Sequence, residues 1–254
     1  MRYLLLFLFL FSTALGLSQV PDEEELYVPT KVEKDTVQER EYSFLRKDND
    51  TMIKTNDLLY REDQFYLALT YNLLQNRTQD ISQSAFSAGV SLGFLRDFPI
   101  NEDRNIALAV GVGYSYNDFR SNLYISEVGD EITYQIADNF DKNQFTLHYV
   151  EVPLEFRWRT STPKNTRFWR IYTGVKFSYL FYNRSQIIGE DFSERVKNNP
   201  DFNKAKYSVY LSVGHGGFNF YINYSLNPIF KNAYLNGETI ELTSLNLGII
   251  FYFL

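Results

Sequence analysis

From residue 64 onward, apolar and polar residues alternate with a period of two, and this alternation restricts the folds open to the chain. Successive side chains of a β-strand point to opposite faces, so the alternation predicts strands with one apolar face. Turn signals divide the region into separate segments. The expected strands cover roughly residues 64–74, 84–96, 105–117, 143–160, 168–183, 204–214, 217–227 and 242–254. The sequence therefore predicts an all-β domain.

The two faces of these segments differ strongly in chemistry. One face is almost entirely lipophilic, as Val150, Leu154 and Trp158 illustrate in the fourth segment. The opposite face carries Gly, Ala and Ser in the second and third segments and charged residues, such as Glu155 and Arg170, in the fourth and fifth. A soluble β-sandwich or barrel also has one apolar face, so the alternation alone leaves that alternative open.

Three further features favour a membrane barrel. The segments reach about ten residues or more, which is the length that a tilted strand needs to cross a bilayer. Aromatic residues crowd the strand ends, and short connections alternate with long ones, as in outer-membrane barrels. Lipid cannot satisfy an open sheet edge, so the strands must close. We predict an eight-stranded antiparallel up-and-down transmembrane β-barrel in the outer membrane, apolar outward, with both termini periplasmic.

The segment before the barrel has a different character. "MRYLLLFLFLFSTALGLSQV" has a basic residue, a short apolar stretch and small residues, which predicts a secretory signal peptide over residues 1–18, with cleavage after Gly16 as the alternative. Residues 19–63 are charged and aperiodic, and we expect a mostly disordered periplasmic arm before the barrel of residues 64–254. Removal of the signal peptide, which contains Arg2, leaves 24 basic and 31 acidic residues, and this negative net charge disfavours nucleic acid as a partner.

The inward face of the fourth and fifth segments predicts a buried charge network. An eight-stranded barrel has an interior just wide enough for side chains to fill, so we expect a packed polar core. If Trp158 and Trp169 are interfacial residues that face each other across the hairpin, Glu151 lies opposite Lys176 and Arg157 opposite Arg170. Unpaired buried charges cost several kcal/mol, so pairing is expected. The predicted lumenal network consists of Glu151, Glu155, Arg157, Arg170 and Lys176.

The last segment contains Asn246-x-Gly248-x-x-Phe251-x-Phe253, which places a polar residue, a glycine and two aromatics at set positions. This pattern resembles the C-terminal signal that the barrel-assembly machinery recognises in outer-membrane proteins. Its physical role is that of a closing strand, which must pair with the first strand and present its rings to the membrane interface. We therefore expect the assembly machinery to be a partner during insertion.

Enzymatic chemistry has little support in the sequence. His148 falls on the lipid-facing parity and His215 in a tight "HGG" turn, and neither has a serine and an acid at recognisable spacing. Cysteine is absent, which excludes thiol chemistry. We expect a protein that is not an enzyme and that binds no cofactor and no metal. A barrel-embedded hydrolase or acyltransferase, and a minor pore or ligand-binding barrel, remain the alternatives.

The hairpin "YVEVPLEFRWRTSTPKNTRFWRIYTGVKFSYLF", together with "YREDQFYLALTYNLL" and "LGIIFYFL", resembles the PorT (or SprT) family of Bacteroidetes. These are outer-membrane β-barrel proteins associated with the type IX secretion system. The resemblance implies a role in type IX protein secretion, and in gliding motility where it occurs, with other secretion components as partners. It supplies no catalytic residues.

Overall fold

The computed structural model describes residues 63–78, 80–83, 85–101, 104–129, 131–160, 169–216 and 218–253. The predicted signal peptide and residues 19–62 of the predicted arm lie outside the described residues. Within the described ranges, no helix is long and apolar enough to span a membrane.

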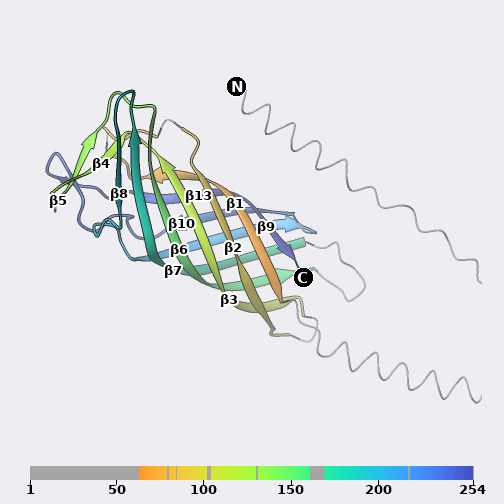
Figure 1. The fold of residues 1–254 in the computed structure, drawn as a ribbon. Coiled ribbons are helices and arrows are strands. Elements are labelled where there is room, and N and C mark those ends of the chain that lie inside the picture. The colour runs from red at the N-terminus through yellow and green to blue at the C-terminus, as the bar shows by residue number, and fades with distance from the viewer. Residues whose placement is uncertain are drawn as a thin grey trace, which may run out of the picture. The chain divides into compact units, whose positions relative to one another are not determined.

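Long antiparallel strands form one closed sheet (Figure 1). Their order around the barrel is β6-β3-β2-β1-β13-β10-β9-β7, and β6 also pairs with β7. The ring therefore has eight strands and no free edge, as the sequence predicts. The strands are β1 (Gln64–Gln75), β2 (Ala88–Pro99), β3 (Ile106–Arg120), β6 (Lys142–Arg159), β7 (Trp169–Ile188), β9 (Ala205–His215), β10 (Phe218–Ser225) and β13 (Thr243–Phe253).

The predicted alternation of long and short connections is confirmed. The long connections carry the remaining strands, β4 (Leu123–Val128), β5 (Glu131–Ile136), β8 (Ser193–Lys197), β11 (Tyr234–Leu235) and β12 (Glu238–Thr239). β4 and β5 form a hairpin beyond the left-hand end of the barrel in Figure 1, whereas the short turns lie at the opposite end, near the C-terminus. We call the end with the long connections the outer end and the other the turn end.

The lipophilic face of the strands points away from the barrel axis. Leu154 is 49% exposed, whereas its neighbour Glu155 is 1% exposed. A soluble sandwich would bury the first and expose the second, so this inversion decides between the two predicted alternatives. Exposed apolar side chains cover every wall of the barrel, and they include Phe65, Leu69, Leu92, Leu108, Val112, Val150, Val152, Phe156, Val175, Phe177, Val209, Leu211, Phe220 and Ile222. An apolar surface of this extent requires a lipid environment.

We predict that Leu154→Arg lowers the free energy of unfolding by about 2–4 kcal/mol, because it places a charge in the middle of the exposed apolar row of β6, which runs from Val150 to Trp158. Urea unfolding in phospholipid vesicles, followed by tryptophan fluorescence, measures the change. The matched control is Val128→Arg, since Val128 lies at the end of the β4–β5 hairpin and is 69% exposed. Equal losses for the two variants would contradict the assignment of the lipid face.

The outer end of the interior is closed by apolar side chains rather than by the polar packing that the sequence predicts throughout. Phe119 and Phe145 stack there with ring centroids 5.1 Å apart, and Phe202 and Phe230 from the long connections pack beside them. We call this apolar cluster the cap; its buried members are Leu74, Ile81, Phe119, Leu123, Ile125, Phe145, Leu147, Tyr149, Leu180, Phe202, Ile229, Phe230, Ala233, Leu235, Ile240 and Leu242.

Outside the barrel strands, polar contacts tie the hairpin to the other connections. The Tyr134 hydroxyl of β5 donates to Asp201 Oδ2 at 2.8 Å and accepts from the Asn199 side-chain amide at 2.9 Å. Burial raises the pKa of Tyr134, so this phenol stays protonated and keeps donating. The Tyr124 hydroxyl of β4 donates to Glu194 of β8. The outer end is therefore an ordered part of the fold.

Candidate functional site

The charged side chains of β6 project into the lumen because they occupy alternate positions of one strand. Glu151, Glu155, Arg157 and Arg159 are each at most 5% exposed. Removal of charges from water in this way requires compensating partners within the lumen. The partners come from the other walls of the barrel.

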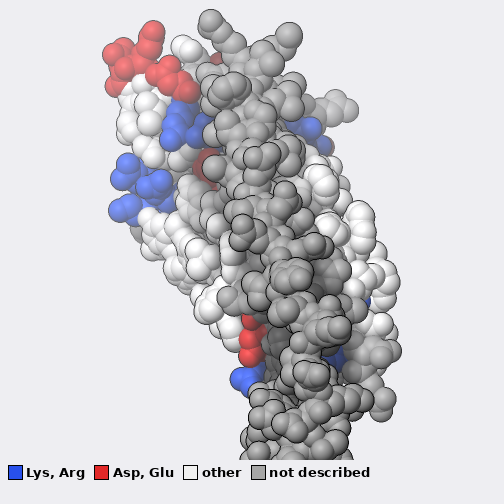
Figure 2. Space-filling model, turned by 90° about the vertical axis from the view of Figure 1, so that its right-hand side faces the viewer, with Lys and Arg blue, Asp and Glu red and all other residues white. Residues whose placement is uncertain are grey.

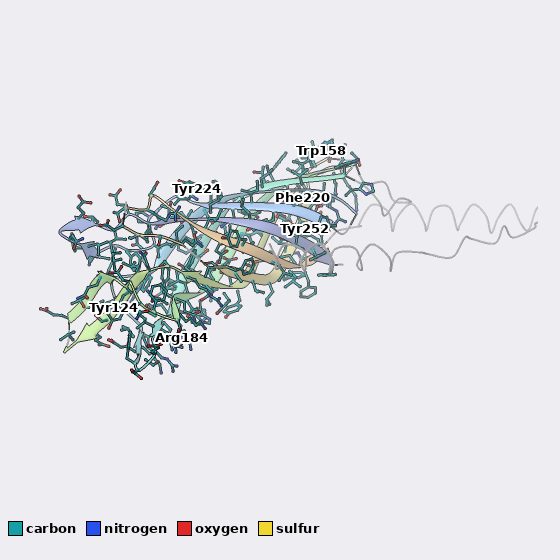
Figure 3. The ribbon with its side chains drawn as sticks, turned by 90° about the horizontal axis from the view of Figure 1, so that it is seen from above. Tyr124, Trp158, Arg184, Phe220, Tyr224 and Tyr252 are labelled. Carbon is teal, nitrogen blue, oxygen red and sulfur yellow. The ribbon has the colours of Figure 1, made fainter. Side chains whose placement is uncertain are left out.

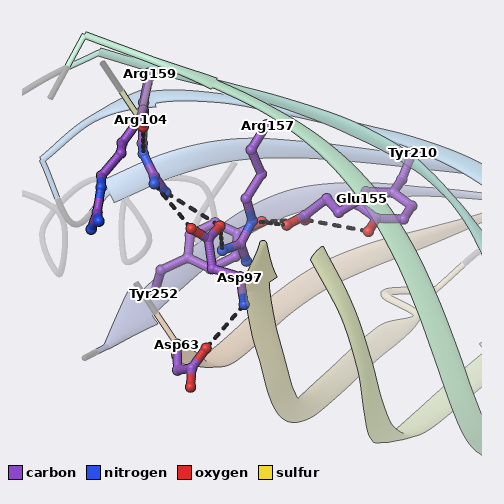
Figure 4. A network of polar contacts seen from close by, with 8 residues as sticks. All are labelled: Asp63, Asp97, Arg104, Glu155, Arg157, Arg159, Tyr210 and Tyr252. Carbon is purple, nitrogen blue, oxygen red and sulfur yellow. Dashed lines mark hydrogen bonds and ion pairs between the residues drawn. The ribbon is translucent and has the colours of Figure 1, made fainter. Parts of the chain in front are cut away.

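Asp97 of β2 provides the main counter-charge at the turn end (Figure 4). Its carboxylate accepts from Arg157 Nη1 at 2.9 Å and from Arg159 Nη2 at 3.0 Å. Arg157 Nε donates to Glu155 Oε2 at 2.7 Å, which links the two carboxylates through one guanidinium. All four side chains are at most 1% exposed, so they form a dry cluster across two strands.

Tyrosines from three further strands complete this cluster. The hydroxyls of Tyr210 and Tyr252 donate to Glu155 Oε1 at 3.3 and 3.1 Å. The guanidinium carbon of Arg157 lies 4.9 Å from the ring centroid of Tyr172, within the range of a cation–π interaction. Figure 4 shows Tyr210 and Tyr252 reaching Glu155 from different walls. The cluster therefore binds β2, β6, β7, β9 and β13 together.

A second ion pair lies further toward the outer end. Lys176 Nζ of β7 is 2.9 Å from Glu151 Oε2 of β6 and donates to the Tyr221 hydroxyl at 3.0 Å. The same ammonium lies 5.4 Å from the ring centroid of Tyr210. Lys206 of β9 is also buried, with its ammonium 5.3 Å from the centroid of Tyr149. Two lysines and one glutamate thus share this level with aromatic rings.

Asparagines form a third level below the cap. The side-chain amide of Asn246 donates to Asn117 Oδ1 at 3.1 Å and to Asn72, and Asn72 donates to Asn117 at 3.4 Å. Asn223 donates to Asn246 Oδ1 at 3.4 Å. Asn72, Asn117 and Asn246 each donate and accept, with the Asn117 amide donating to Ser115 Oγ, so this level is held together without a net charge.

The register predicted for the β6–β7 hairpin is wrong by two residues. Trp158 pairs with Ile171, not Trp169, because the backbone N–H of Thr160 donates to the Trp169 carbonyl at 3.0 Å and so extends the ladder by one pair. Arg157 consequently lies opposite Tyr172, and Arg159 rather than Arg157 lies opposite Arg170. A shift of two residues leaves every side chain on its predicted face.

The register shift also changes how Lys176 reaches Glu151. Lys176 is directly opposite Pro153, and Glu151 is opposite Ser178. The ion pair is therefore diagonal, and it forms because a lysine side chain spans the distance to a diagonal neighbour. Arg170, the remaining residue of the predicted network, is buried on the lumenal face.

Asp97 and Arg159 are the members of the turn-end cluster that the predicted network omits. Arg159 has the same inward parity as Arg157, which was a usable signal. Asp97 lies one residue past the predicted second strand, which in the structure continues to Pro99. Counting by two from Gly93 through Leu95 places Asp97 inward, so a longer strand would have revealed it.

The other predicted residues occupy the following places. Trp158 and Trp169 are 38% and 56% exposed on the outward face at the turn end (Figure 3 labels Trp158). Phe251 and Phe253 are on the outward face of β13, whereas Asn246 and Gly248 are on the inward face, and Gly248 pairs with Thr70 of β1. β13 therefore closes the barrel against β1, as the sequence predicts.

Neither histidine lies in the lumen. His148 is on the outward face, where its Nδ1 is 2.7 Å from the Tyr114 hydroxyl. His215 is exposed as the last residue of β9, where it pairs with Phe218 and Trp169, and not within the turn as the sequence predicts. Within the ranges that the structure describes, no group of three or more His, Asp or Glu side chains could hold a metal ion.

A closed antiparallel barrel with lipid-facing apolar residues and a lumen packed by charged, tyrosine and asparagine side chains defines a small outer-membrane β-barrel protein. Residues 39–231 match the family described as "Outer membrane protein beta-barrel domain", and the chain belongs to this family. No curated protein matches the chain.

Solved structures of other outer-membrane barrels show limited similarity. The attachment invasion locus protein Ail of Yersinia pestis is 14% identical, with 77% of this chain and 100% of Ail covered and a TM-score of 0.34. A mutant of the Rh. blastica porin is 8% identical, with 76% of this chain and 100% of the porin covered and a TM-score of 0.20.

Proposed function

We propose that this protein is a non-enzymatic, non-conducting outer-membrane barrel that supports type IX protein secretion, and gliding motility where it occurs. The observation that carries the non-conducting part is the lumen itself. Ion pairs, tyrosines and asparagines fill successive levels of it, and the cap covers the outer end. Interlocking side chains of this kind hold a barrel rigid and oppose the passage of solutes.

The secretion role rests on the resemblance of the β6–β7 hairpin and of the first and last strands to the PorT family. In this proposal the turn end and both termini face the periplasm, where the other secretion components would contact the chain, and the cap faces outward. Asn246, Gly248, Phe251 and Phe253 would serve the barrel-assembly machinery during insertion. The lumenal charges stabilise the barrel and perform no catalysis.

Deletion of the gene is expected to abolish export of proteins that carry the type IX C-terminal signal, and the full-length chain should restore it. The His148→Ala variant should restore export equally, because His148 lies on the outer wall and performs no chemistry in this proposal. Immunoblots of culture supernatants measure export. Normal export in the deletion strain would refute the secretion role, failure of His148→Ala would point to chemistry, and steady currents in planar bilayers would refute the filled lumen.

A further inference from the structure

A β-bulge near the outer end of β7 changes which side chains face outward. The register between β6 and β7 shifts at His148/Tyr149, where Tyr182 pairs with His148 and Leu180 with Tyr149. Phe181 and Tyr182 both lie on the outer side at the bulge, and from there on Arg184 and Gln186 face outward while Asn183 and Ser185 face inward. The bulge thereby turns Arg184 from the interior to the surface (Figure 3).

Basic residues from three neighbouring strands align with Arg184 on this surface. Across the ladder, Arg184 pairs with Lys197 of β8, and the next outward row brings Gln186 opposite Arg195. Arg120 of β3 and Lys142 of β6 occupy the same face at the ends of their strands. We call this set the basic rim: Arg120, Lys142, Arg184, Arg195 and Lys197.

The basic rim carries an excess of positive charge. Its acidic neighbour in these rows is Asp118, whose carboxylate accepts from Arg120 Nε at 3.2 Å, and the charges of Lys142 and Arg184 also act on Asp118. Arg195 and Lys197 are exposed and Arg184 is partly exposed, with a buried Nε that has no hydrogen-bond partner among the described residues. Figure 2 shows basic side chains gathered on one flank near the upper end, with acidic side chains above them and uncharged surface below them. The rim is therefore able to accept an anion.

Directly below the basic rim lies a belt of aromatic rings. His148 lies between Tyr116 and Tyr182, with ring centroids 5.2 Å from each, and Tyr114 and Phe181 adjoin it. Below the belt the outward residues of β6 are apolar, beginning with Val150. The order apolar, aromatic, basic is the order of environments from the bilayer core to the headgroups.

A hollow of about 390 Å³ opens beside the rim. β8 and β9 both pair with the same edge of β7. The connection between them is bound to β7 at its two ends, where the Asn198 N–H donates to the Asn183 carbonyl and the Lys204 carbonyl accepts from the Leu180 N–H. Between these two points the connection moves away from β7. Tyr179, Phe181, Pro200 and Lys204 are among the residues that line the hollow. The hollow thus joins an apolar wall to polar and basic groups.

We infer that the basic rim and the adjoining hollow bind a phosphorylated glycolipid of the outer leaflet. Arg184 and Lys197 would bind a headgroup phosphate, with Arg120 and Arg195 at its sides, while the aromatic belt and the hollow contact the sugar and the start of an acyl chain. The inference rests on the membrane orientation proposed above but not on the role in secretion.

The test uses the full chain in detergent micelles and lipid A with both phosphates as the probe. Native mass spectrometry or a titration should show binding that Arg184→Gln with Lys197→Gln weakens about thirtyfold, since two charges near a lipid surface are lost. The matched control is Arg96→Gln, because Arg96 is an exposed, outward basic residue at the turn end. Dephosphorylated lipid A should bind the native chain as weakly as the double variant binds lipid A. Both variants should keep the heat-modifiability of the native barrel on gels.

Equal affinity for dephosphorylated lipid, or an equal loss in Arg96→Gln, would overturn the inference. Saturable binding of inorganic phosphate with the same affinity as lipid A would identify the ligand as a free anion. Binding of an acidic protein but not of lipid A would identify it as a protein. Either outcome would also overturn the inference. Export assays separate the two proposals. The chain can be required for export without binding lipid A, and it can bind lipid A without being required for export.

Discussion

Asp97→Asn is expected to lower the free energy of unfolding by about 3–5 kcal/mol, the loss typical of removing one partner from a buried ion pair. The carboxylate is fully buried and accepts from two guanidiniums, Arg157 at 2.9 Å and Arg159 at 3.0 Å. Asparagine keeps the size and one oxygen but removes the charge. Glu155 then remains in contact with Arg157, and Arg159 loses its two bonds to the Asp97 carboxylate.

Urea unfolding in lipid vesicles measures this loss, because the chain's two tryptophans, Trp158 and Trp169, flank the turn next to the cluster. Asp138→Asn is the matched control, since Asp138 is an exposed carboxylate in the connection between β5 and β6, and it should change stability by less than about 0.5 kcal/mol. Asp97→Asn combined with Arg159→Met should recover part of the loss. An unchanged urea midpoint for Asp97→Asn would show that the cluster contributes little to stability.

The barrel itself was predictable because its strands show a regular alternation of apolar and polar residues with a period of two. From Glu151 to Arg159 the charged residues all fall on alternate positions, with Pro153 at the one remaining position of that face, and this parity fixes the face of every side chain whatever the register. A mistaken register between β6 and β7 therefore still placed Glu151, Arg157 and Lys176 in the lumen. The pairing partners depended instead on the turn, where Thr160 adds one more pair.

The features that were not predicted lie where the sequence does not alternate regularly between apolar and polar residues or where the alternation is interrupted. The cap draws Phe202, Phe230 and Ile240 from connections whose sequence does not alternate, so their burial depends on the closed fold. The basic rim requires the bulge at Phe181 and Tyr182, and uninterrupted counting from Tyr179 places Arg184 inside the barrel. Asp97 was missed because the predicted second strand ends at residue 96, whereas β2 continues to Pro99.

Lys176→Glu is expected to destabilise the barrel by at least as much as Asp97→Asn, because it converts an attraction into a repulsion. Lys176 Nζ and Glu151 Oε2 are 2.9 Å apart, and both side chains are at most 7% exposed. Two carboxylates at this separation cannot both remain ionised in a dry site, so one must take up a proton or the lumen must open. We expect a loss of more than about 3–5 kcal/mol, seen as a barrel that no longer resists heat before electrophoresis.

The reciprocal variant, Lys176→Glu with Glu151→Lys, distinguishes a paired interaction from a general need for lysine at this position. It restores the opposite charges on β6 and β7 and should recover most of the heat-modifiability, although Tyr221 loses its donor and the anion and cation near Lys206 exchange places. Lys176→Met is the neutral comparison and should fall between the native chain and Lys176→Glu, since Lys206 still lies near enough for its charge to interact with Glu151. If the reciprocal variant unfolds as readily as Lys176→Glu alone, the stability of this level comes from the tyrosines around the ion pair and not from the pair.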